Sequence, residues 1–375
     1  MITIHAMGDS LVTAYGSDED NFIGGWGDHL WSFFDTEHVK VNVYAQGGRS
    51  SRSYLNEGRF IDNGNFTMED FPYGMGPVCN RIKPGDYVVM QFCHNDDNSK
   101  DKLTYIDRMT PLGTPDENGI YPTIVPTEEM KTSTANLPEE YPGILIDDGV
   151  SEQMIEENRK KYEELLPTYG DSYYAYSCGA TYKGYLKFYI DNIRKLGATP
   201  VLVTAPARQY FKDGKIQAVP GHHGNEDKFG KFPYVRAVRQ LGKEENVVVV
   251  DLFERSCELL EMLGETDAKY LHSIKDENGA TIGEARYDRP KKWVEEYDSC
   301  WQENSFAEVD NTHQNRLGSY LYAAMLAEGI AQQIPELEKR ILKTSQKEML
   351  CPERLISRIP EIEALVARIS LTAFL

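Results

Sequence analysis

Ser10 is the residue in this chain best suited to act as a nucleophile. It ends the sequence Met7-Gly8-Asp9-Ser10, which directly follows a short apolar run at residues 2–6. A tight Gly-Asp-Ser turn between a strand and a helix would expose the hydroxyl and surround it with backbone N–H groups. Such turns also occur for structural reasons alone, and a serine hydroxyl needs a base within hydrogen-bonding distance before it can attack.

A base and an acid lie three residues apart near the other end of the chain. An imidazole side chain titrates near neutral pH as a rule, so His313 is a candidate base that can take a proton and return it. The carboxylate of Asp310 can accept a hydrogen bond from the second ring nitrogen. A turn leading into a helix that starts near Asn315 would bring the two together, although aspartate at such a position is also a common helix N-cap. Together with Ser10, the pair predicts a Ser-His-Asp triad for ester cleavage.

Attack on an ester carbonyl creates an oxyanion, which needs hydrogen-bond donors placed in advance. The sequence offers the backbone N–H of Ser10, the backbone N–H of Gly48 and the side-chain amide of Asn95. Glycine lets the main chain approach a substrate closely. Each donor has a structural alternative, because Gly47-Gly48 is also compatible with a strained turn and Asn95 with a turn cap.

The apolar pattern predicts the elements that would hold these residues. Short apolar runs predict buried parallel strands at residues 2–7, 39–45, 86–92, 200–205 and 246–252. Helical periodicity lies between and after them, at residues 179–197, 229–245, 254–264 and 314–333. This alternation predicts a doubly wound α/β sheet with the site outside the carboxyl ends of its strands. The candidate loops at Ser10, Gly48 and Asn95 each follow such a strand.

Composition and charge narrow the possible partners. The chain has 375 residues, of which 41% are hydrophobic, enough for a packed core. With 40 basic and 59 acidic residues the formal net charge is −19, so we expect neither nucleic acid nor a membrane surface as partner. Six cysteines without a CxxC pair favour free thiols in a reducing compartment. No apolar run approaches ~20 residues and no signal peptide is visible, so we expect a cytoplasmic protein.

The remaining histidines suggest no cofactor. His5 lies in a predicted strand, where we expect a core residue with its polar atoms satisfied. His222 and His223 have no cysteine or carboxylate at ligand spacing, so we predict no metal site there. His272 has no visible partner in the sequence.

These residues resemble the sequence blocks of the SGNH or GDSL hydrolases. Met7 to Ser10 match the first block, Gly48 the glycine block, Asn95 the asparagine block, and Asp310 with His313 the final Asp-x-x-His block. The chain looks most similar to the rhamnogalacturonan acetylesterase-like carbohydrate esterases. That likeness lies in Gly25-Trp26-Gly27, in Gln91-Phe92-Cys93-His94-Asn95-Asp96 and in Thr312-His313-Gln314-Asn315-Arg316-Leu317-Gly318.

The resemblance implies a flavodoxin-like three-layer α/β/α fold with a central five-stranded parallel sheet and large loop insertions. It also implies hydrolysis of O-acetyl groups on sugars without a metal or other cofactor. By its place in the asparagine block, His94 is a candidate substrate-binding residue. Cys93 departs from the pattern, because the group usually has a glycine there, and we expect its side chain to crowd the backbone beside the oxyanion pocket and so to affect the geometry of Asn95.

We expect one hydrolase domain over residues 1–340, with insertions at about 97–175 and 265–305, and a helical extension at 341–375. Long insertions at the functional end of a sheet often shape a binding cleft. Tyr121, Trp293 and Trp301 are candidates for stacking on sugar rings, with ordinary packing as the alternative. The apolar face of the extension either packs on the domain or forms a homodimer contact.

The sequence therefore favours a serine esterase that removes acetyl groups from plant-type oligosaccharides. A lipase or thioesterase on the same scaffold is the first alternative, and it would prefer longer acyl chains, but no long apolar lid is visible. A non-catalytic carbohydrate-binding protein on this scaffold is the second alternative. Loss of a triad residue would support it, and all three residues are present.

Overall fold

The computed structural model describes a large part of the chain, and every structural statement below concerns that part. The described residues are 1–16, 23–64, 77–97, 108–127, 180–219, 221–275, 281–284 and 308–342. Trp293, Trp301 and residues 343–375 lie outside them, so the expectations for those residues stay predictions.

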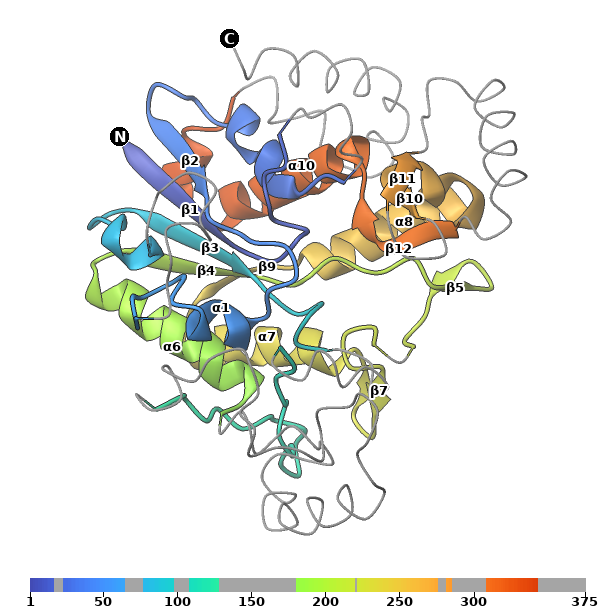
Figure 1. The fold of residues 1–375 in the computed structure, drawn as a ribbon, viewed down its shortest axis with the longest axis horizontal. Coiled ribbons are helices and arrows are strands. Elements are labelled where there is room, and N and C mark those ends of the chain that lie inside the picture. The colour runs from blue at the N-terminus through green and yellow to red at the C-terminus, as the bar shows by residue number, and fades with distance from the viewer. Residues whose placement is uncertain are drawn as a thin grey trace.

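A five-stranded parallel sheet forms the centre of the molecule (Figure 1). Its strands, in spatial order, are β2 (Val39–Val43), β1 (Ile2–Gly8), β3 (Tyr87–Gln91), β4 (Thr199–Val203) and β9 (Val248–Val250). The register pairs Ile4 of β1 with Val41 of β2 and with Tyr87 of β3. All five strands predicted from the apolar runs are confirmed.

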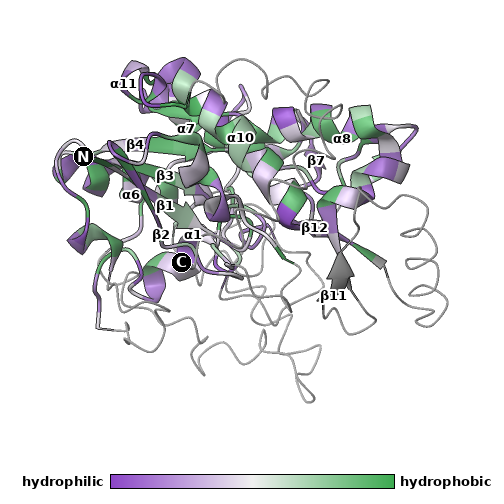
Figure 2. Cartoon of the chain, turned by 90° about the horizontal axis from the view of Figure 1, so that it is seen from above, coloured by the Kyte–Doolittle hydropathy of each residue, from purple (hydrophilic) through white to green (hydrophobic). Residues whose placement is uncertain are grey.

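Side chains alternate between two apolar layers, one on each face of this sheet. In β4, Val201 and Val203 pack on one side, whereas Leu202 between them packs on the other. This period of two follows from the pleat of a strand. Both layers are buried, which explains why the strands are nearly continuous apolar runs. In Figure 2 the central strands are accordingly mostly green, whereas purple and green segments alternate along α8.

Helices cover both faces and complete three layers (Figure 1). On one face lie α1 (Ser51–Asn56), α6 (Tyr182–Lys195) and α7 (Pro233–Glu244). On the other lie α8 (Leu252–Ala268), which is kinked at Gly264, and α10 (Arg316–Gln333), followed by the short α11 (Pro335–Glu338). The predicted α/β/α architecture is therefore confirmed. Among the described residues, no helix combines the length and the hydropathy needed to cross a bilayer.

Local signals explain where α6 begins and ends and where α10 begins. The Thr181 side chain accepts the Gly184 N–H at the start of α6, and Gly197 follows its end with a φ of +77°. Glycine adopts that left-handed conformation without strain. The Asn315 side chain caps α10 by accepting the Gly318 N–H. The predicted helix starting near Asn315 is thus confirmed, and Asn315, not Asp310, is its N-cap.

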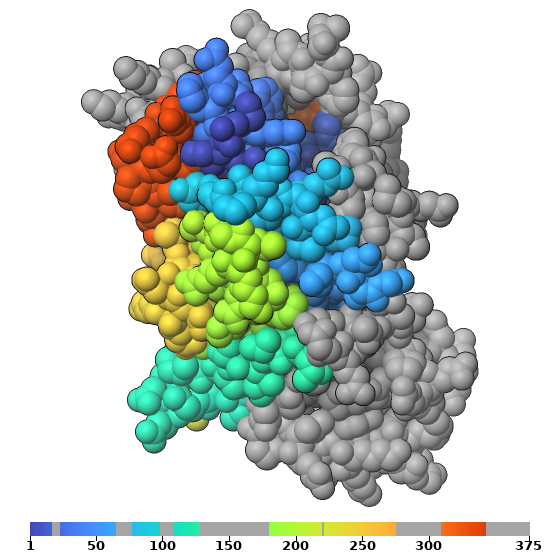
Figure 3. All heavy atoms as spheres, turned by 90° about the vertical axis from the view of Figure 1, so that its left-hand side faces the viewer, coloured from blue at the N-terminus to red at the C-terminus, as the bar shows by residue number. Residues whose placement is uncertain are grey.

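Smaller antiparallel sheets flank the main one. The largest has the strand order β11 (Thr281–Glu284), β10 (His272–Lys275) and β12 (Glu308–Gln314). Two short hairpins pair β5 (Phe211–Lys212) with β6 (Lys215–Ile216) and β7 (Glu226–Asp227) with β8 (Gly230–Lys231). Segment 108–127, drawn in teal in Figure 3, lies against the amino-terminal end of α6, where Lys183 donates to the Tyr121 carbonyl.

The strand order reverses between β1 and β3, which are adjacent in the sheet. From β1 the chain runs outward to β2, then returns to β3 and continues to β4 and β9 on the other side. In open α/β sheets, ligands bind beyond the carboxyl ends of the strands at such a reversal. Ser10 follows β1 and Asn95 follows β3, so both lie at this point.

Candidate active site

The turn after β1 presents Ser10. The Asp9 carboxylate accepts the Leu11 N–H at 2.9 Å, and the Asp9 carbonyl accepts the N–H groups of Val12 and Thr13 at 3.1 Å each. These bonds close a tight turn with Ser10 at its tip. The Gly25-Trp26-Gly27 segment packs so closely on this turn that a Cβ on Gly25 would lie 2.1 Å from the Thr13 carbonyl oxygen.

Ser10 and His313 are in hydrogen-bonding contact, although 303 positions separate them in the chain. Ser10 Oγ lies 2.9 Å from His313 Nε2, and His313 Nδ1 lies 2.7 Å from Asp310 Oδ2. A carboxylate only accepts hydrogen bonds, so Nδ1 carries the ring proton and Nε2 presents its lone pair to the serine hydroxyl. The structure therefore brings together the three residues predicted to form a triad.

The Asp310 carboxylate is bonded through both oxygens. Oδ2 faces His313, and Oδ1 accepts the backbone N–H groups of Thr312 at 2.8 Å and His313 at 3.0 Å. Burial alone would raise the pKa of Asp310. The hydrogen bond and charge of His313, together with the two backbone donors, outweigh it and hold the pKa of Asp310 well below its usual range. Asp310 is therefore ionised at any ordinary pH.

The segment that carries Asp310 and His313 is a bulged strand, which corrects the prediction of a turn. Both residues lie in β12, paired with β10 of the antiparallel sheet. The register moves from Ile274 opposite Val309 to His272 opposite Gln314, so residues 310–313 face a single residue of β10. A bulge of this kind re-aims side chains and is common beside active sites. Here it lets the Asp310 side chain fold back onto the N–H groups that follow it.

The glycine and asparagine loops lie beside Ser10. A Cβ on Gly47 would stand 3.7 Å from Ser10 Cβ, and Gly48 has a φ of +77° that favours glycine. The Asn95 amide donates to the Arg49 carbonyl at 3.1 Å, which ties the two loops together. Within the described residues, the backbone N–H groups of Ser10 and Gly48 have no acceptor.

Buried contacts anchor the Asn95 loop from below. The Asp96 carboxylate accepts the N–H of Ser51 at 3.0 Å and its hydroxyl at 2.5 Å, at the start of α1. These bonds hold the Asn95 loop against the start of α1. The Cys93 side chain lies against His223, with Sγ 2.9 Å from Nδ1. The Cys93 side chain is thus buried in the core, and Asn95 still contacts Arg49 although cysteine replaces the usual glycine.

Comparison with known proteins places these features in a family context. No protein-family model matches the chain. The chain is 23% identical over 348 residues to the rhamnogalacturonan acetylesterase RhgT of Bacillus subtilis (strain 168), covering 92% of this chain and 97% of the relative. It is 26% identical over 263 residues to the probable rhamnogalacturonan acetylesterase YesY of the same organism, covering 70% and 75%. A solved structure, the protein YxiM from Bacillus subtilis, has a TM-score of 0.47 and 17% identity, over 88% of this chain and 56% of that one.

The near full-length similarity to RhgT agrees with the sequence blocks and with the five-stranded sheet already described. The chain belongs to the SGNH hydrolase superfamily. In this SGNH hydrolase the serine, glycine and asparagine blocks follow β1, β2 and β3, and the Asp-x-x-His block lies in β12.

Two predicted substrate contacts are not available on the surface of this SGNH hydrolase. Tyr121 is 2% exposed, its hydroxyl donates to Asp227, and it accepts from Arg236 at 2.7 Å. A ring packed on all sides has no face left for a sugar, so Tyr121 is a packing residue and that expectation is corrected. His94 is also buried, edge-on to His223, with Nδ1 3.7 Å from the Asp9 carboxylate.

The sequence did not reveal a buried polar network beneath the nucleophile. Trp26 Nε1 donates to Gln91 Oε1 at 2.7 Å, and Gln91 Nε2 lies 3.5 Å from Asp9 Oδ1. Arg208 follows β4 and donates to the His94 carbonyl at 3.2 Å, with no carboxylate partner among the described residues. The signal for Arg208 was its position, since residues just after a parallel strand meet at the functional edge of the sheet.

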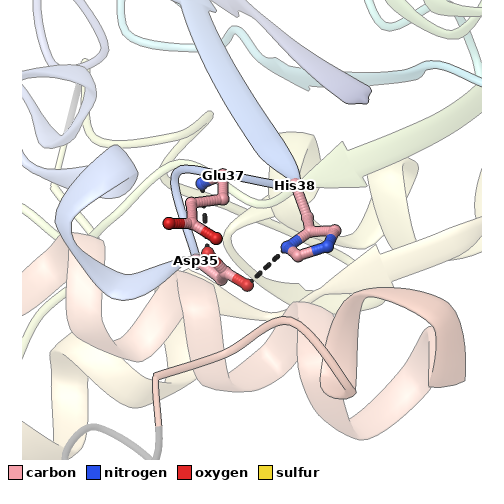
Figure 4. Close-up of side chains that lie close together, drawn as sticks. All are labelled: Asp35, Glu37 and His38. Carbon is pink, nitrogen blue, oxygen red and sulfur yellow. Dashed lines mark hydrogen bonds and ion pairs between the residues drawn. The ribbon is translucent and has the colours of Figure 1, made fainter.

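The ring nitrogens of His222 and His223 contact other groups of the protein. His222 accepts the Arg208 N–H and contacts the Gln217 carbonyl, and His223 contacts Cys93 and the Pro206 carbonyl, so all four ring nitrogens are occupied. Elsewhere in the described residues, three side chains lie close enough together just before β2 to bind a single metal ion, as Figure 4 shows. They are Asp35, Glu37 and His38, which form an exposed turn at the opposite, amino end of the sheet.

Proposed function

We propose that this SGNH hydrolase is a serine carbohydrate esterase that removes O-acetyl groups from plant-type oligosaccharides. The observation that carries the proposal is the chain of hydrogen bonds from Ser10 Oγ through His313 to Asp310, at 2.9 and 2.7 Å. A hydroxyl, an imidazole of the right tautomer and an ionised carboxylate in this order are the parts that acyl transfer by serine requires.

In the first half of the reaction, Ser10 Oγ attacks the acetyl carbonyl carbon while its proton moves to His313 Nε2. Asp310 stabilises the imidazolium that forms. The tetrahedral intermediate then collapses: the bond to the sugar oxygen breaks, and His313 gives its proton to that oxygen. Sugar alcohol leaves, and acetyl-Ser10 remains.

In the second half, water gives a proton to His313 Nε2 as its oxygen attacks the acetyl-Ser10 carbonyl. The ester bond to Ser10 breaks and His313 returns the proton to Ser10 Oγ. The product leaves as acetic acid, which gives its remaining proton to solvent to become acetate. In both halves the negative charge on the carbonyl oxygen would be held by the N–H groups of Ser10 and Gly48 and by Asn95. The Asn95 amide has two N–H groups, and one of them already bonds the Arg49 carbonyl.

The sugar ester is proposed from the named relatives. RhgT and YesY are both named as rhamnogalacturonan acetylesterases, and the alignment with RhgT extends over nearly the whole of both chains. Acetylated pectic oligosaccharides are therefore the first substrates to test.

The test compares the wild-type protein with Ser10→Ala on an aryl acetate and on acetylated pectin, xylan and mannan oligosaccharides. Acetate release by the wild type, and its collapse in a Ser10→Ala variant with unchanged circular dichroism, are expected. Retained turnover in the folded variant would end the serine mechanism. Rates that rise with acyl chain length on aryl esters would instead favour a lipase or thioesterase, and binding of acetylated sugar without acetate release would favour a carbohydrate-binding protein.

A further inference from the structure

The strand beside the β12 bulge contains a buried histidine that the reaction itself does not use. His272 lies in β10, is fully buried, and its Nδ1 lies 2.8 Å from the backbone carbonyl oxygen of Asp310. A carbonyl oxygen can only accept, so Nδ1 carries a proton and donates it to this bond. Burial also lowers the pKa of His272 to about 4, which keeps the ring neutral at pH 7.

The neighbours of His272 hold the other end of the same bulge. Asn315 Nδ2 donates to the Tyr270 carbonyl at 2.7 Å, and the Asn315 backbone N–H donates to the Leu271 carbonyl at 3.0 Å. A Cβ on Gly318 would lie 2.2 Å from that Leu271 oxygen, so the first turn of α10 sits directly on this strand. The exit of the bulge is therefore fixed at residue 315.

The loop after β4 also contacts the middle of the bulge. The Gln209 N–H, in the loop after β4, donates to the Asn311 carbonyl at 2.9 Å. At the start of the bulge, the His272 side chain bonds the main-chain carbonyl of Asp310, which carries the acid of the pair. Rotation of that peptide would swing the Asp310 carboxylate away from His313 Nδ1.

We propose that His272 is a positioning residue: its Nδ1–H holds the Asp310 carbonyl and so fixes the bulge that aims Asp310 and His313 at Ser10. His272 touches neither Ser10 nor a reacting atom, and it acts only through the bulge. The inference rests on the proposed function where activity is the readout. It predicts that the donor at Nδ1, and not the imidazole ring as such, is what the site needs.

The test uses variants that differ in where they carry a donor. Asparagine places its amide nitrogen one bond beyond Cγ, where Nδ1 stands, and leucine has the same branching without a donor. His272→Leu should lower kcat by about 10- to 100-fold, the size expected for a small misplacement of catalytic groups, with KM nearly unchanged. His272→Asn should recover most of that loss. His272→Gln, whose amide lies further out, should not.

A measurement that needs no substrate keeps the inference separate from the proposed function. The proton on His313 Nδ1, shared with Asp310, gives a low-field proton NMR signal. We expect that signal to persist in His272→Asn and to shift or broaden in His272→Leu or His272→Gln. Equal kcat and equal spectra in all three variants would overturn the inference, as would an Asn variant as impaired as the Gln variant. If the Leu variant does not fold, the Asn and Gln pair decides alone. If the wild-type protein shows no esterase activity but the NMR spectra of the variants differ as expected, the result counts against the proposed function only.

Discussion

The segment that carries Ser10 and the segment that carries His313 each contain a buried aspartate. The pKa values of these two aspartates shift in opposite directions. Asp9, in the turn after β1, accepts the Leu11 N–H through one oxygen, while Oδ2 has no hydrogen-bond partner among the described residues. Burial therefore raises the pKa of Asp9 to about 6. Asp310, in the β12 bulge, is also buried, but the ring of His313 and two backbone N–H groups face it, and its pKa lies well below the usual range.

The difference shows that burial alone does not decide the charge of a carboxyl group. What decides it is how many donors and positive charges face the two oxygens. The bulge provides them for Asp310 because residues 310–313 fold back on themselves opposite a single residue of β10. The turn provides fewer for Asp9, so ionising Asp9 costs folding free energy, whereas ionising Asp310 contributes it.

The largest effect is expected when each of the two aspartates, Asp310 and Asp9, is replaced by asparagine. Asp310→Asn would present an N–H to His313 Nδ1 and favour the wrong ring tautomer, so we expect kcat to fall by about 10⁴-fold. Asp9→Asn makes the same change at a buried aspartate of the turn that presents Ser10, and it should cost less than Asp310→Asn because Asp9 forms no hydrogen bond with His313. Steady-state kinetics on an aryl acetate measure both. Equal losses in the two variants would show that Asp310 has no special role.

The second prediction concerns the donors on the nucleophile side. Asn95→Ala removes one proposed oxyanion donor and should lower kcat by about 10²- to 10³-fold. Asn95→Asp keeps the size but places an acceptor where the oxyanion forms, so it should be at least as impaired. KM should change little in either case. Full activity in Asn95→Asp would exclude Asn95 from the oxyanion site.

The third prediction follows from the opposite pKa shifts. The pKa of Asp9 rises on folding from ~4 to about 6. Protonated Asp9 therefore contributes folding stability below pH ~4, and this contribution is lost as the pH rises through about 6. Asp9→Asn removes that loss, and its free energy of unfolding relative to the wild type should rise by about 1–3 kcal/mol between pH 4 and 7. Asp310 has the opposite sign, so Asp310→Asn should cost most near neutral pH and progressively less as the pH falls below ~4.

Urea unfolding at a series of pH values checks this contrast. Asp28 and Asp97, whose pKa values are also raised, titrate in wild type and variants alike and cancel in the difference between two curves. The charge of Asp9 contributes to the raised pKa of Asp96, so the Asp9→Asn curve includes that coupling. Difference curves that are flat for both variants would contradict the assigned shifts.

The main sheet could be predicted from the sequence because each strand is a short local apolar run. The 201–203 stretch of β4, for example, needs only burial on both faces to become a central strand. The positions of Ser10, Gly48 and Asn95 follow, because carboxyl ends of parallel strands meet at one edge. The β12 strand could not be predicted in the same way. Its sequence, Glu308 to Gln314, is polar, and it becomes a strand by pairing with β10, more than thirty residues earlier in the chain.

The same limit explains His272 and Tyr121. The partner of His272 is a backbone carbonyl in the bulge, and a backbone partner cannot be predicted from the pattern of side chains in the sequence. Tyr121 lies in a Pro-, Asp- and Gly-rich segment that suggests an exposed loop, yet its backbone N–H bonds the Gln240 side chain and its hydroxyl bonds Asp227. Contacts with helix α7 and its hairpin thus turn a loop aromatic into a core residue.

The smallest effect is expected at Tyr121, which lies outside the segments of Asp9 and Asp310. The substitution tests whether Tyr121 is a packing residue and not a sugar-binding residue. Tyr121→Phe removes the hydroxyl, but Asp227 and Arg236 remain paired with each other at 2.6 Å, and Asp227 still accepts the Phe229 N–H at 2.8 Å. No buried charge is left alone, so we expect a loss of only about 1 kcal/mol in the free energy of unfolding. kcat and KM on acetylated oligosaccharides should stay at wild-type values, as they should for a residue that packs and does not bind sugar. A KM that rises on oligosaccharides but not on an aryl acetate would instead return Tyr121 to the substrate site.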